Sequence, residues 1–357
     1  MAAELGEAFV NRFMLAHLIW AVAASADGAK SVDPGAWVPV APMNLARQEI
    51  GAARVGTNVY VVGGIISGPP SVNTSTVERY DTTLDQWDFV APLPEGRDHT
   101  GCAAARSEVY CVGGFNAARE PTDTVYVYSP GPDMWRESTP LPLPLASCWA
   151  VGFEDKIYVF GGISTARVAL ASAYRFDPLT GEWEQLADMP TPREHLTAVA
   201  LNTHIYVIGG RASGVPTTAN ERYNPRNDRW RVQASMPTAR AAMFAGSYDG
   251  RRIFVAGGET PVLHSVNEVY DVKTDTWENN TAMAVPRHGL AAVPITGGIL
   301  APAGGIVQGH GATNYVDVFV PSEAVLPAAS VIALALLAGV VAFAGAWIRL
   351  RARRTRF

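Results

Sequence analysis

Charge is scarce in this sequence, and positive charge is scarcer still. Charged residues make up 17% of the 357 positions, with 28 basic and 33 acidic side chains. Five of the basic residues are arginines in the last nine positions, which leaves 23 basic and 33 acidic side chains in the rest of the chain. Binding of phosphate backbones needs clustered positive charge. This balance excludes a nucleic-acid partner.

Helical periodicity is missing outside the chain ends, so a long apolar helix would have no partner helix to pack against. Residues 326–348 carry no charged side chain. At ~1.5 Å per residue, this stretch is long enough to cross a hydrocarbon core of ~30 Å. The sequence therefore predicts a short linker and transmembrane helix over residues 322–348, followed by a basic cytoplasmic tail over residues 349–357.

A shorter apolar run near the N-terminus predicts a signal peptide over residues 1–26. The run covers residues 13–24 and leads into Ala24-Ser25-Ala26, a small-residue cleavage site. Together with the arginine tail, this predicts a single-pass type I membrane protein of the cell surface or an endomembrane, with the remainder extracellular or lumenal. Glu4, Glu7 and His17 depart from the usual signal-peptide pattern. A cytosolic, tail-anchored protein is therefore the alternative.

The middle of the chain repeats with a period close to 48 residues. Six glycine pairs are spaced 47–50 residues apart, and five tryptophans each follow a Tyr or Phe by seven positions. The pairs begin at Gly63, Gly113, Gly161, Gly209, Gly257 and Gly304, and the tryptophans are Trp87, Trp135, Trp183, Trp230 and Trp277. A shared period in unrelated residue types is typical of repeat architectures.

Each repeat divides into four short strands, which is the content of one propeller blade. In the fourth repeat, an alternating segment turns at residues 202–203 into the run Ile205–Ile208, which ends at a glycine pair. The pattern IYVIGG…ERYNPRNDRW…MPTAR resembles the kelch repeat, and the resemblance covers residues 37–321. It implies an all-β propeller and says little about function.

The two chain ends determine the number of blades. The sixth repeat reaches Phe319 without a tryptophan strand, and residues 37–43 match the tryptophan strand of residues 183–189. We therefore expect a six-bladed kelch β-propeller over residues 27–321, closed by the N-terminal strand, which leaves no exposed sheet edge. Pro302 has no N–H to donate to a strand ladder, so we expect the sixth blade to be distorted.

A basic residue precedes the first strand in five repeats, namely Arg47, Arg97, Arg193, Arg240 and Arg287. Nearby in the sequence stand Glu49, His99, Glu194, His195 and His288. In a closed ring we expect these side chains to converge on the channel mouth, where arginine forks recognise carboxylates. This predicts a site for a protein or an acidic ligand. The alternative is structural, because arginines at this position of kelch repeats also tie down loops through backbone carbonyls.

Metal binding and cofactors are not predicted. His99, His195 and His288 lie in different repeats and form no compact ligand motif. The strand directions of kelch blades imply that the chain leaves Phe319 on the face opposite the mouth. The ligand face should then point away from the bilayer.

The three cysteines allow one intrachain pair. Cys102 and Cys111 lie on the arms of one predicted hairpin and face each other if residues 106–107 form the turn. This makes a disulfide feasible in an oxidising compartment, and two buried thiols are the alternative. Cys148 is left unpaired. Asn73 and Asn279 begin glycosylation sequons.

The function favoured by these features is that of a membrane-anchored binding module whose site is the outward-facing propeller mouth. The first alternative is an isomerase of the sugar-acid mutarotase type, because sialic-acid mutarotases resemble this chain in being exported six-bladed kelch proteins. In that case His99, His195 and Glu194 are the candidate bases, with arginines holding the substrate carboxylate. The second alternative is the cytosolic tail-anchored adaptor.

Overall fold

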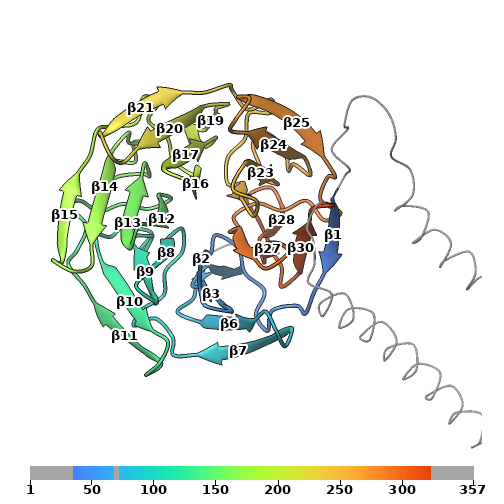
Figure 1. Cartoon of the computed structure of the whole chain (residues 1–357). Helices are drawn as coiled ribbons and strands as arrows, with labels where there is room; N and C mark the ends of the chain where they lie inside the picture. Colours follow the sequence, from blue (N-terminus) through green and yellow to red (C-terminus); the bar gives the residue numbers. More distant parts are fainter. Residues whose placement is uncertain (1–34, 68–71, 323–357) are drawn as a thin grey trace, which may run out of the picture. The chain divides into compact units, whose positions relative to one another are not determined.

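The computed structural model describes residues 35–67 and 72–322, and these residues form six four-stranded antiparallel sheets arranged as blades around a central channel (Figure 1). The predicted signal peptide, transmembrane helix and cytoplasmic tail lie outside the described residues. Within the described part of the chain, no helix is long and apolar enough to span a membrane. The prediction of an all-β, six-bladed propeller is confirmed.

The strands of each blade follow one another from the channel outward. Blade 1 contains β2 (Gly51–Val55), β3 (Asn58–Val62), β6 (Val77–Asp81) and β7 (Gln86–Val90). Blade 2 contains β8 (Gly101–Ala105), β9 (Glu108–Val112), β10 (Val125–Ser129) and β11 (Met134–Glu137). Blade 3 contains β12 (Trp149–Phe153), β13 (Lys156–Phe160), β14 (Ala173–Asp177) and β15 (Glu182–Gln185).

The other three blades follow the same order. Blade 4 contains β16 (Thr197–Leu201), β17 (His204–Ile208), β20 (Asn220–Asn224) and β21 (Arg229–Val232). Blade 5 contains β22 (Phe244–Gly246), β23 (Arg252–Ala256), β24 (Asn267–Asp271) and β25 (Thr276–Asn280). Blade 6 contains β26 (Val293–Ile295), β27 (Gly298–Pro302), β30 (Val316–Val320) and β1 (Ala36–Pro39).

Short hairpins extend the loops between the second and third strands of three blades. They are formed by β4 (Ile65–Ser67) with β5 (Val72–Asn73), β18 (Arg211–Ala212) with β19 (Val215–Pro216), and β28 (Gly305–Val307) with β29 (His310–Ala312). Because neighbouring strands are antiparallel, these loops lie on the face from which the first strands start. We call this face the mouth face.

The N-terminal strand closes the ring as predicted. In the antiparallel register of β1 and β30, Trp37 pairs with Phe319. The Trp37 ring also packs edge-on against Phe244 of blade 5, at a centroid distance of 6.1 Å. Since β30 runs away from the mouth, Gly35 and Ser322 lie on the opposite face. Blade 6 is less distorted than expected, because Pro302 is the last residue of β27 and still pairs with Val316.

Five of the six glycine pairs are explained by their contact with the next blade, and in blade 6 the equivalent positions are Ala303 and Gly304. Gly64 has a φ of 105°, which side-chain-bearing residues rarely adopt, and its N–H donates to the carbonyl of Arg97 at 2.8 Å. A Cβ on Gly63 would lie 2.3 Å from the same carbonyl oxygen. The equivalent bond from Gly304 to the carbonyl of Arg47, at 2.9 Å, joins the last blade to the first.

The tryptophans and aspartates of the outer strands join neighbouring blades. The Trp87 indole donates to the carbonyl of Ala41 at 2.8 Å, and the Ala41 N–H donates to the Asp85 carboxylate at 2.8 Å. The Asp85 carboxylate also accepts the Tyr80 hydroxyl at 2.7 Å. The same arrangement recurs in three further blades, around Asp133, Asp228 and Asp275. This repeat explains why Tyr and Trp share the period of the glycines.

Candidate functional site

The five predicted arginines are buried inside the blades, and they do not converge on the channel mouth. Arg47, Arg193, Arg240 and Arg287 are 0% exposed, and Arg97 is 2% exposed. This position contradicts the expectation that their guanidinium groups recognise an acidic ligand at the mouth. The alternative structural role fits the geometry, because each guanidinium group forms its hydrogen bonds and ion pairs within its own blade.

Four of these arginines form ion pairs with buried carboxylates on the third strand of the same blade. The partners are Glu78 for Arg47, Glu221 for Arg193, Glu268 for Arg240 and Asp317 for Arg287. Backbone carbonyls complete the bonding, as where Arg47 donates to Gly63 and Thr76 at 3.1 and 2.6 Å. Arg97 instead pairs with Glu95 on the loop before it. An unpaired buried charge is strongly destabilising, so these pairs hold the blades together internally.

The mouth itself is formed by the residues two positions after the five arginines and after Leu145, which takes the place of the arginine in the remaining repeat. They are Glu49, His99, Ser147, His195, Ala242 and Gly289, and all six have φ values between 51° and 59°. Each N–H donates to the carbonyl of the preceding member, at distances from 2.6 to 3.0 Å, and the bond from Glu49 to Gly289 closes the circle. We call these six residues the mouth ring. Left-handed backbone conformation in residues other than glycine is costly and often marks functional sites.

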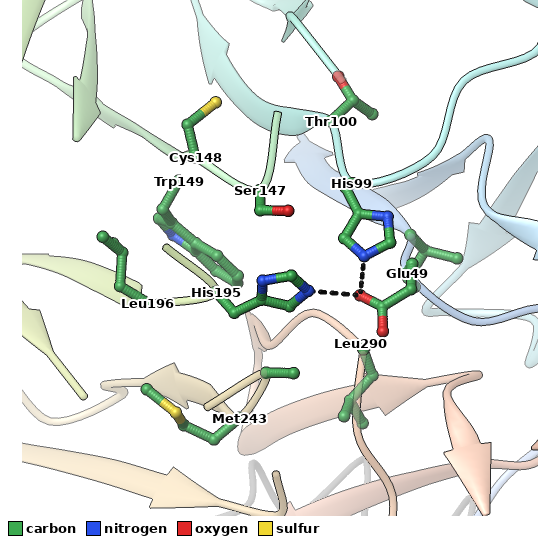
Figure 2. A pocket seen from close by; sticks show the side chains of 13 residues that line it. Glu49, His99, Thr100, Ser147, Cys148, Trp149, His195, Leu196, Met243 and Leu290 are labelled. Atoms are coloured by element: carbon green, nitrogen blue, oxygen red, sulfur yellow. Dashed lines mark ion pairs between the residues drawn. The ribbon is translucent and has the colours of Figure 1, made fainter. Parts of the chain in front are cut away.

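A small cavity of about 40 Å³ lies at the mouth ring. Polar groups of the ring line it together with apolar side chains at or just before the first strands, including Trp149, Met243 and Leu290 (Figure 2). A single water needs roughly 10–15 Å³ on this measure. The cavity therefore has room for an ion with a few waters.

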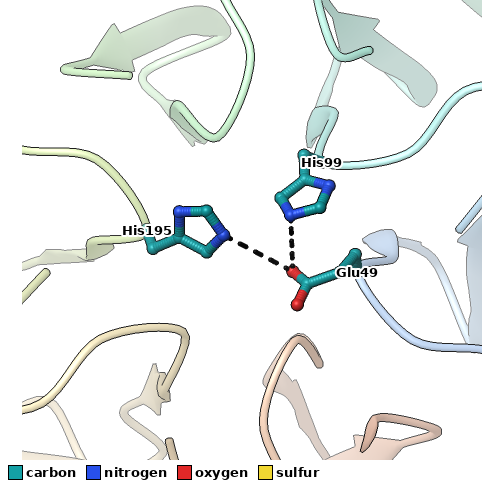
Figure 3. Close-up of side chains that lie close together, drawn as sticks. All are labelled: Glu49, His99 and His195. Carbon is teal, nitrogen blue, oxygen red and sulfur yellow. Dashed lines mark ion pairs between the residues drawn. The ribbon is translucent and has the colours of Figure 1, made fainter. Parts of the chain in front are cut away.

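Three ring residues bring potential ligand atoms together in this cavity (Figure 3). The Glu49 carboxylate lies 3.3 Å from Nε2 of His99 and 4.0 Å from Nε2 of His195. The ligand atoms of these three side chains all lie within 4.8 Å of one another. The sequence prediction that Glu49, His99 and His195 meet at the mouth agrees with this geometry.

Each of the two ring histidines is backed by a carboxylate. Nδ1 of His99 lies 2.5 Å from Asp98, which also binds Arg119 at 2.5 Å. Nδ1 of His195 contacts Glu194, which binds Arg211 at 2.7 Å. The Arg211 guanidinium also lies 3.5 Å from Nδ1 and 3.4 Å from Nε2 of His195. Glu194 lies outside the group of three that faces the cavity.

The two histidines differ in their ionisation. Burial lowers the pKa of His99, but the Glu49 and Asp98 carboxylates outweigh burial and the net shift is upward. Burial and the positive charge of Arg211 hold the pKa of His195 well below its usual value. At neutral pH, His195 is therefore a neutral imidazole with a nitrogen lone pair. Bonds from His99 and Arg119 overcome the burial of Asp98 and lower its pKa.

His288 lies behind the mouth ring and is fully buried. Its Nε2 atom lies 3.6 Å from the carboxylates of both Glu49 and Glu259. Among the described residues this nitrogen has no hydrogen-bond partner. His288 therefore belongs to the same polar cluster, although the arginine that precedes it does not.

Sequence reasoning missed the other half of the mouth ring and three charged residues of the cluster, namely Arg119, Arg211 and Glu259. Ser147, Ala242 and Gly289 stand at the same offset as Glu49, two positions after Leu145, Arg240 and Arg287, so the repeat register was a sufficient signal. Arg211 and Glu259 come from the loops of blades 4 and 5 and are bonded to each other at 3.2 Å. No spacing rule in the sequence connects these two loops.

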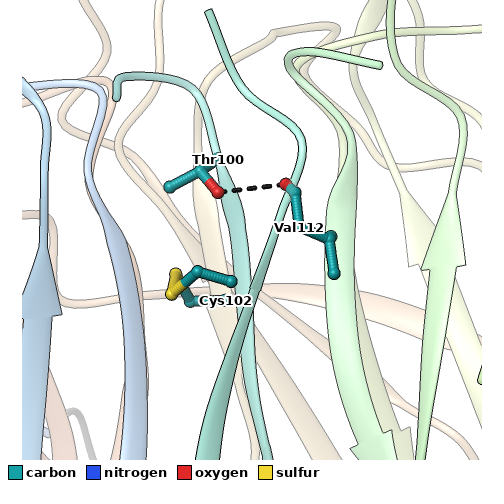
Figure 4. The surroundings of a disulfide bond; sticks show 4 residues. Thr100, Cys102 and Val112 are labelled. Carbon is teal, nitrogen blue, oxygen red and sulfur yellow. Dashed lines mark hydrogen bonds between the residues drawn. A yellow bond between two sulfur atoms is a disulfide. The ribbon is translucent and has the colours of Figure 1, made fainter. Parts of the chain in front are cut away.

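The predicted pairing of Cys102 and Cys111 is present as a disulfide between β8 and β9 (Figure 4). The two residues are directly opposite in the strand register, as the assumed turn required. Thr100 adds a hydrogen bond from its hydroxyl to the carbonyl of Val112, at 3.0 Å. Cys148 is a buried free thiol.

Comparisons with known proteins agree with the geometry. A family model described as the KLHDC2/KLHL20/DRC7 Kelch-repeats domain matches residues 136–305, and the Kelch motif matches residues 46–94 and 96–142. No curated protein matches the chain. The solved structure of YjhT is similar, with a TM-score of 0.70 and 16% identity over 80% of this chain and 97% of that chain. At this identity, the similarity shows the fold alone.

Proposed function

Because the chain belongs to the kelch-repeat β-propeller family, we propose that it is a protein-interaction module that binds its partner on the mouth face. The kelch-propeller family suggests a role in protein interaction. The exposed side chains of the mouth face support this face as the binding surface. The single observation that carries the proposal is a set of exposed aliphatic side chains around the mouth.

Five of the six loops between second and third strands expose an aliphatic residue, and we call this set the crown. The crown consists of Val72, Val168, Val215, Val262, Ile306 and Val307, which are between 46% and 68% exposed. Repeated exposure of apolar side chains on one face is typical of binding surfaces. The turns on the opposite face expose only Leu84 and Leu179 among the large aliphatic residues of the described chain.

The remaining loop, in blade 2, presents the half-exposed side chain of Arg119 above a buried aromatic residue. The guanidinium groups of Arg119 and Arg167 lie over the Phe115 ring at 4.6 and 5.1 Å from its centroid. Aromatic and arginine side chains are enriched in protein interfaces. This loop therefore fits the same partner-binding role as the crown.

A protein partner is favoured over a small acidic ligand. The arginines that would hold a carboxylate are buried in ion pairs, and the cavity at the mouth measures only about 40 Å³. Both observations disfavour an isomerase reaction at His99, His195 and Glu194. A protein needs no deep cavity and can use the whole crown.

Site-specific photo-cross-linking tests the proposed surface. A photoreactive amino acid is placed at Val215 or Val262 of the full-length chain, and at Leu84 or Leu179 as matched controls on the opposite face. We expect a discrete cross-linked partner from the crown positions only. The double variant Val215→Asp with Val262→Asp should no longer bind this partner when the purified proteins are mixed. Equal cross-linking from both faces, or binding unchanged by the aspartates, would refute the mouth face as the interface.

We also propose that a membrane anchor holds the crown away from the bilayer. The uncharged residues 326–348 and the arginines after them support an anchor, and β30 ends on the face opposite the mouth. The test is alkaline carbonate extraction of membranes from cells that make the full-length chain or a chain ending at Ser322. We expect only the full-length chain to stay in the membrane pellet; its complete extraction would overturn the proposal.

A further inference from the structure

We propose that Glu49, His99 and His195 bind a divalent transition-metal ion at the channel mouth. The sequence argued against a metal site because its histidines lie in separate repeats. The mouth ring removes that objection, since it brings three blades within reach of one ion. This inference stands independently of the proposed protein interaction.

The distances between the ligand atoms fit one ion. Metal–nitrogen and metal–oxygen bonds of about 2.1 Å at a tetrahedral angle place two ligand atoms about 3.4 Å apart. The Glu49 carboxylate lies 3.3 Å from His99 Nε2 and 4.0 Å from His195 Nε2. Small side-chain rotations therefore suffice to bring all three atoms into coordination distance. The cavity of about 40 Å³ leaves room for water at the open positions.

The contacts behind the ligands have the form usual in metal sites. A metal-bound histidine nearly always uses its second ring nitrogen to bond a carboxylate, a carbonyl or water, which fixes the orientation of the ring. Nδ1 of His99 bonds Asp98 at 2.5 Å, and Nδ1 of His195 contacts Glu194. The bond to Asp98 turns Nε2 of His99 toward Glu49. Nε2 of His195 also lies 3.4 Å from the Arg211 guanidinium, which has to move aside when an ion binds.

The charge of the cluster also calls for a cation. Four carboxylates, those of Glu49, Asp98, Glu194 and Glu259, are each at most 10% exposed. The guanidinium groups of Arg119 and Arg211 bind three of them and supply two positive charges. Four negative and two positive charges leave a net charge of −2 once both histidines are neutral, so an ion has to displace the proton that Glu49 and Asp98 favour on His99. A divalent ion balances this charge in a site where unpaired charge is costly.

An independent observation comes from His288. Its side chain is 0% exposed, and its Nε2 atom has no hydrogen-bond partner within the described residues. This nitrogen lies 3.6 Å from the Glu49 carboxylate and 3.6 Å from the Glu259 carboxylate. A buried polar nitrogen normally has a partner. A metal-bound water, or Glu49 reoriented by the metal, would supply one.

The backbone of the mouth ring adds a further argument. All six ring positions have a left-handed backbone, and glycine adopts this conformation without strain. Glycine stands only at Gly289, while Glu49, His99 and His195 share this backbone with Ser147 and Ala242. The common conformation gives these five side chains the same orientation relative to the ring, which places the three potential ligands at equivalent positions of three blades.

Imidazole and carboxylate together suit Zn²⁺, Fe²⁺ and related first-row ions better than Ca²⁺ or Mg²⁺. Cys148 also lines the cavity, but burial raises the pKa of its thiol to about 12. A thiol that stays protonated is a poor ligand. The donor set is therefore two nitrogens and one carboxylate oxygen.

The experiment is calorimetric titration of Zn²⁺ into the full-length, tag-free chain after chelator treatment. We expect one site per chain, weakened at least 100-fold by Glu49→Gln or His195→Gln and about 10–100-fold by Asp98→Asn. Co²⁺ should give visible ligand-field bands with the wild-type chain that Zn²⁺ abolishes. This spectrum reports ligation even if one variant fails to fold.

Two controls separate the site from weak surface binding. Ser147→Ala changes a ring residue that is outside the ligand set, and His310→Gln removes an exposed histidine. Both should bind Zn²⁺ like the wild-type chain, and melting curves check that every variant is folded. Absence of a one-to-one site in the wild-type chain, or Zn²⁺ affinity unchanged in Glu49→Gln with His195→Gln, would overturn the proposal.

Discussion

The backbone N–H of Glu49 donates a hydrogen bond of 2.6 Å to the carbonyl oxygen of Gly289, and this bond joins the first blade to the last. It is one of six equivalent bonds, so the mouth is a closed ring of backbone contacts between neighbouring blades. The side chains at the mouth are therefore held by the same bonds that close the propeller. Strain at any member of the ring should therefore lower the free energy of unfolding of the propeller.

We predict that Gly289→Ala destabilises the propeller more than two other glycine-to-alanine changes. Gly289 has a φ of 59°, and its new Cβ would lie 2.9 Å from the Glu49 nitrogen. Gly56→Ala meets no atom within 4 Å but has a φ of 61°, so it should cost about 1–2 kcal/mol from backbone strain alone.

Gly131 is the matched control for this prediction, because it has neither a positive φ nor an atom within 4 Å of the new Cβ. Gly131→Ala should stabilise by about 0.4–1 kcal/mol through the unfolded chain. Urea unfolding of the three variants measures their free energies of unfolding and so ranks their stabilities. A Gly289→Ala variant as stable as Gly56→Ala would show that the ring bond is not under steric constraint.

The propeller could be predicted from the sequence because its determinants repeat. Gly64 is needed where a positive φ meets the carbonyl of the next blade, and Trp87 is needed where its indole reaches Ala41. Both requirements recur once per blade, so they appear as a period. The closing pair of Trp37 and Phe319 followed from the missing strands at the two ends.

The site was predicted only in part because its contacts are not periodic. The position of Arg193 in the repeat was visible, but the sequence does not show that Glu221 on the third strand binds its guanidinium. Conversely, Glu259 reaches the cluster from a loop of variable length and composition. Ring closure decides which side chains face the channel, and this required the three-dimensional structure.

The buried pair of Arg193 and Glu221 leads to a second prediction. The two side chains are 0% and 1% exposed, so Arg193→Met leaves a buried carboxylate without its partner. We expect a loss of about 3–5 kcal/mol in the free energy of unfolding. The exposed pair of Arg79 and Asp88 is the control, and Arg79→Met should cost less than about 1 kcal/mol.

The double variant Arg193→Met with Glu221→Met distinguishes a lost attraction from an unpaired charge. If the cost comes from the uncompensated carboxylate, the double variant should be more stable than Arg193→Met alone. Denaturant midpoints at constant ionic strength measure the difference. A double variant less stable than the single one would mean that the ion pair itself contributes the stability.

The disulfide between Cys102 and Cys111 predicts a defined pattern of thiol reactivity. Burial raises the pKa of the Cys148 thiol to about 12, so iodoacetamide should label no cysteine of the native protein. Unfolding without reductant should expose one thiol, and reduction should expose all three. Intact-mass spectrometry counts the labels; three labels after unfolding without reductant would contradict the disulfide.

Loss of this disulfide should also lower stability. The bond closes a loop with a sequence separation of 9, for which the chain-entropy relation gives roughly 2–3 kcal/mol. We expect this decrease for Cys102→Ser with Cys111→Ser. Cys148→Ala serves as the control for loss of a cysteine without loss of the bond.

The two sequons should differ in glycosylation if the propeller enters the secretory pathway. Asn279 is exposed on the outermost strand of blade 5, where an oligosaccharide meets no neighbouring chain. Asn73 is half-buried, and its amide nitrogen donates to the carbonyl of Phe115 at 3.2 Å. We therefore expect Asn279→Gln to remove most of the glycosidase-sensitive mass and Asn73→Gln to remove little.

Asn227→Gln is the control, because Asn227 is exposed in a turn and is not part of a sequon. It should leave the electrophoretic shift on glycosidase treatment unchanged. Glycan on Asn73 with none on Asn279 would contradict the accessibility argument. Absence of glycan at both sites, together with cleavage of the propeller by protease added from the cytosolic side, would instead favour the cytosolic, tail-anchored topology, because a lumenal propeller is shielded from that protease.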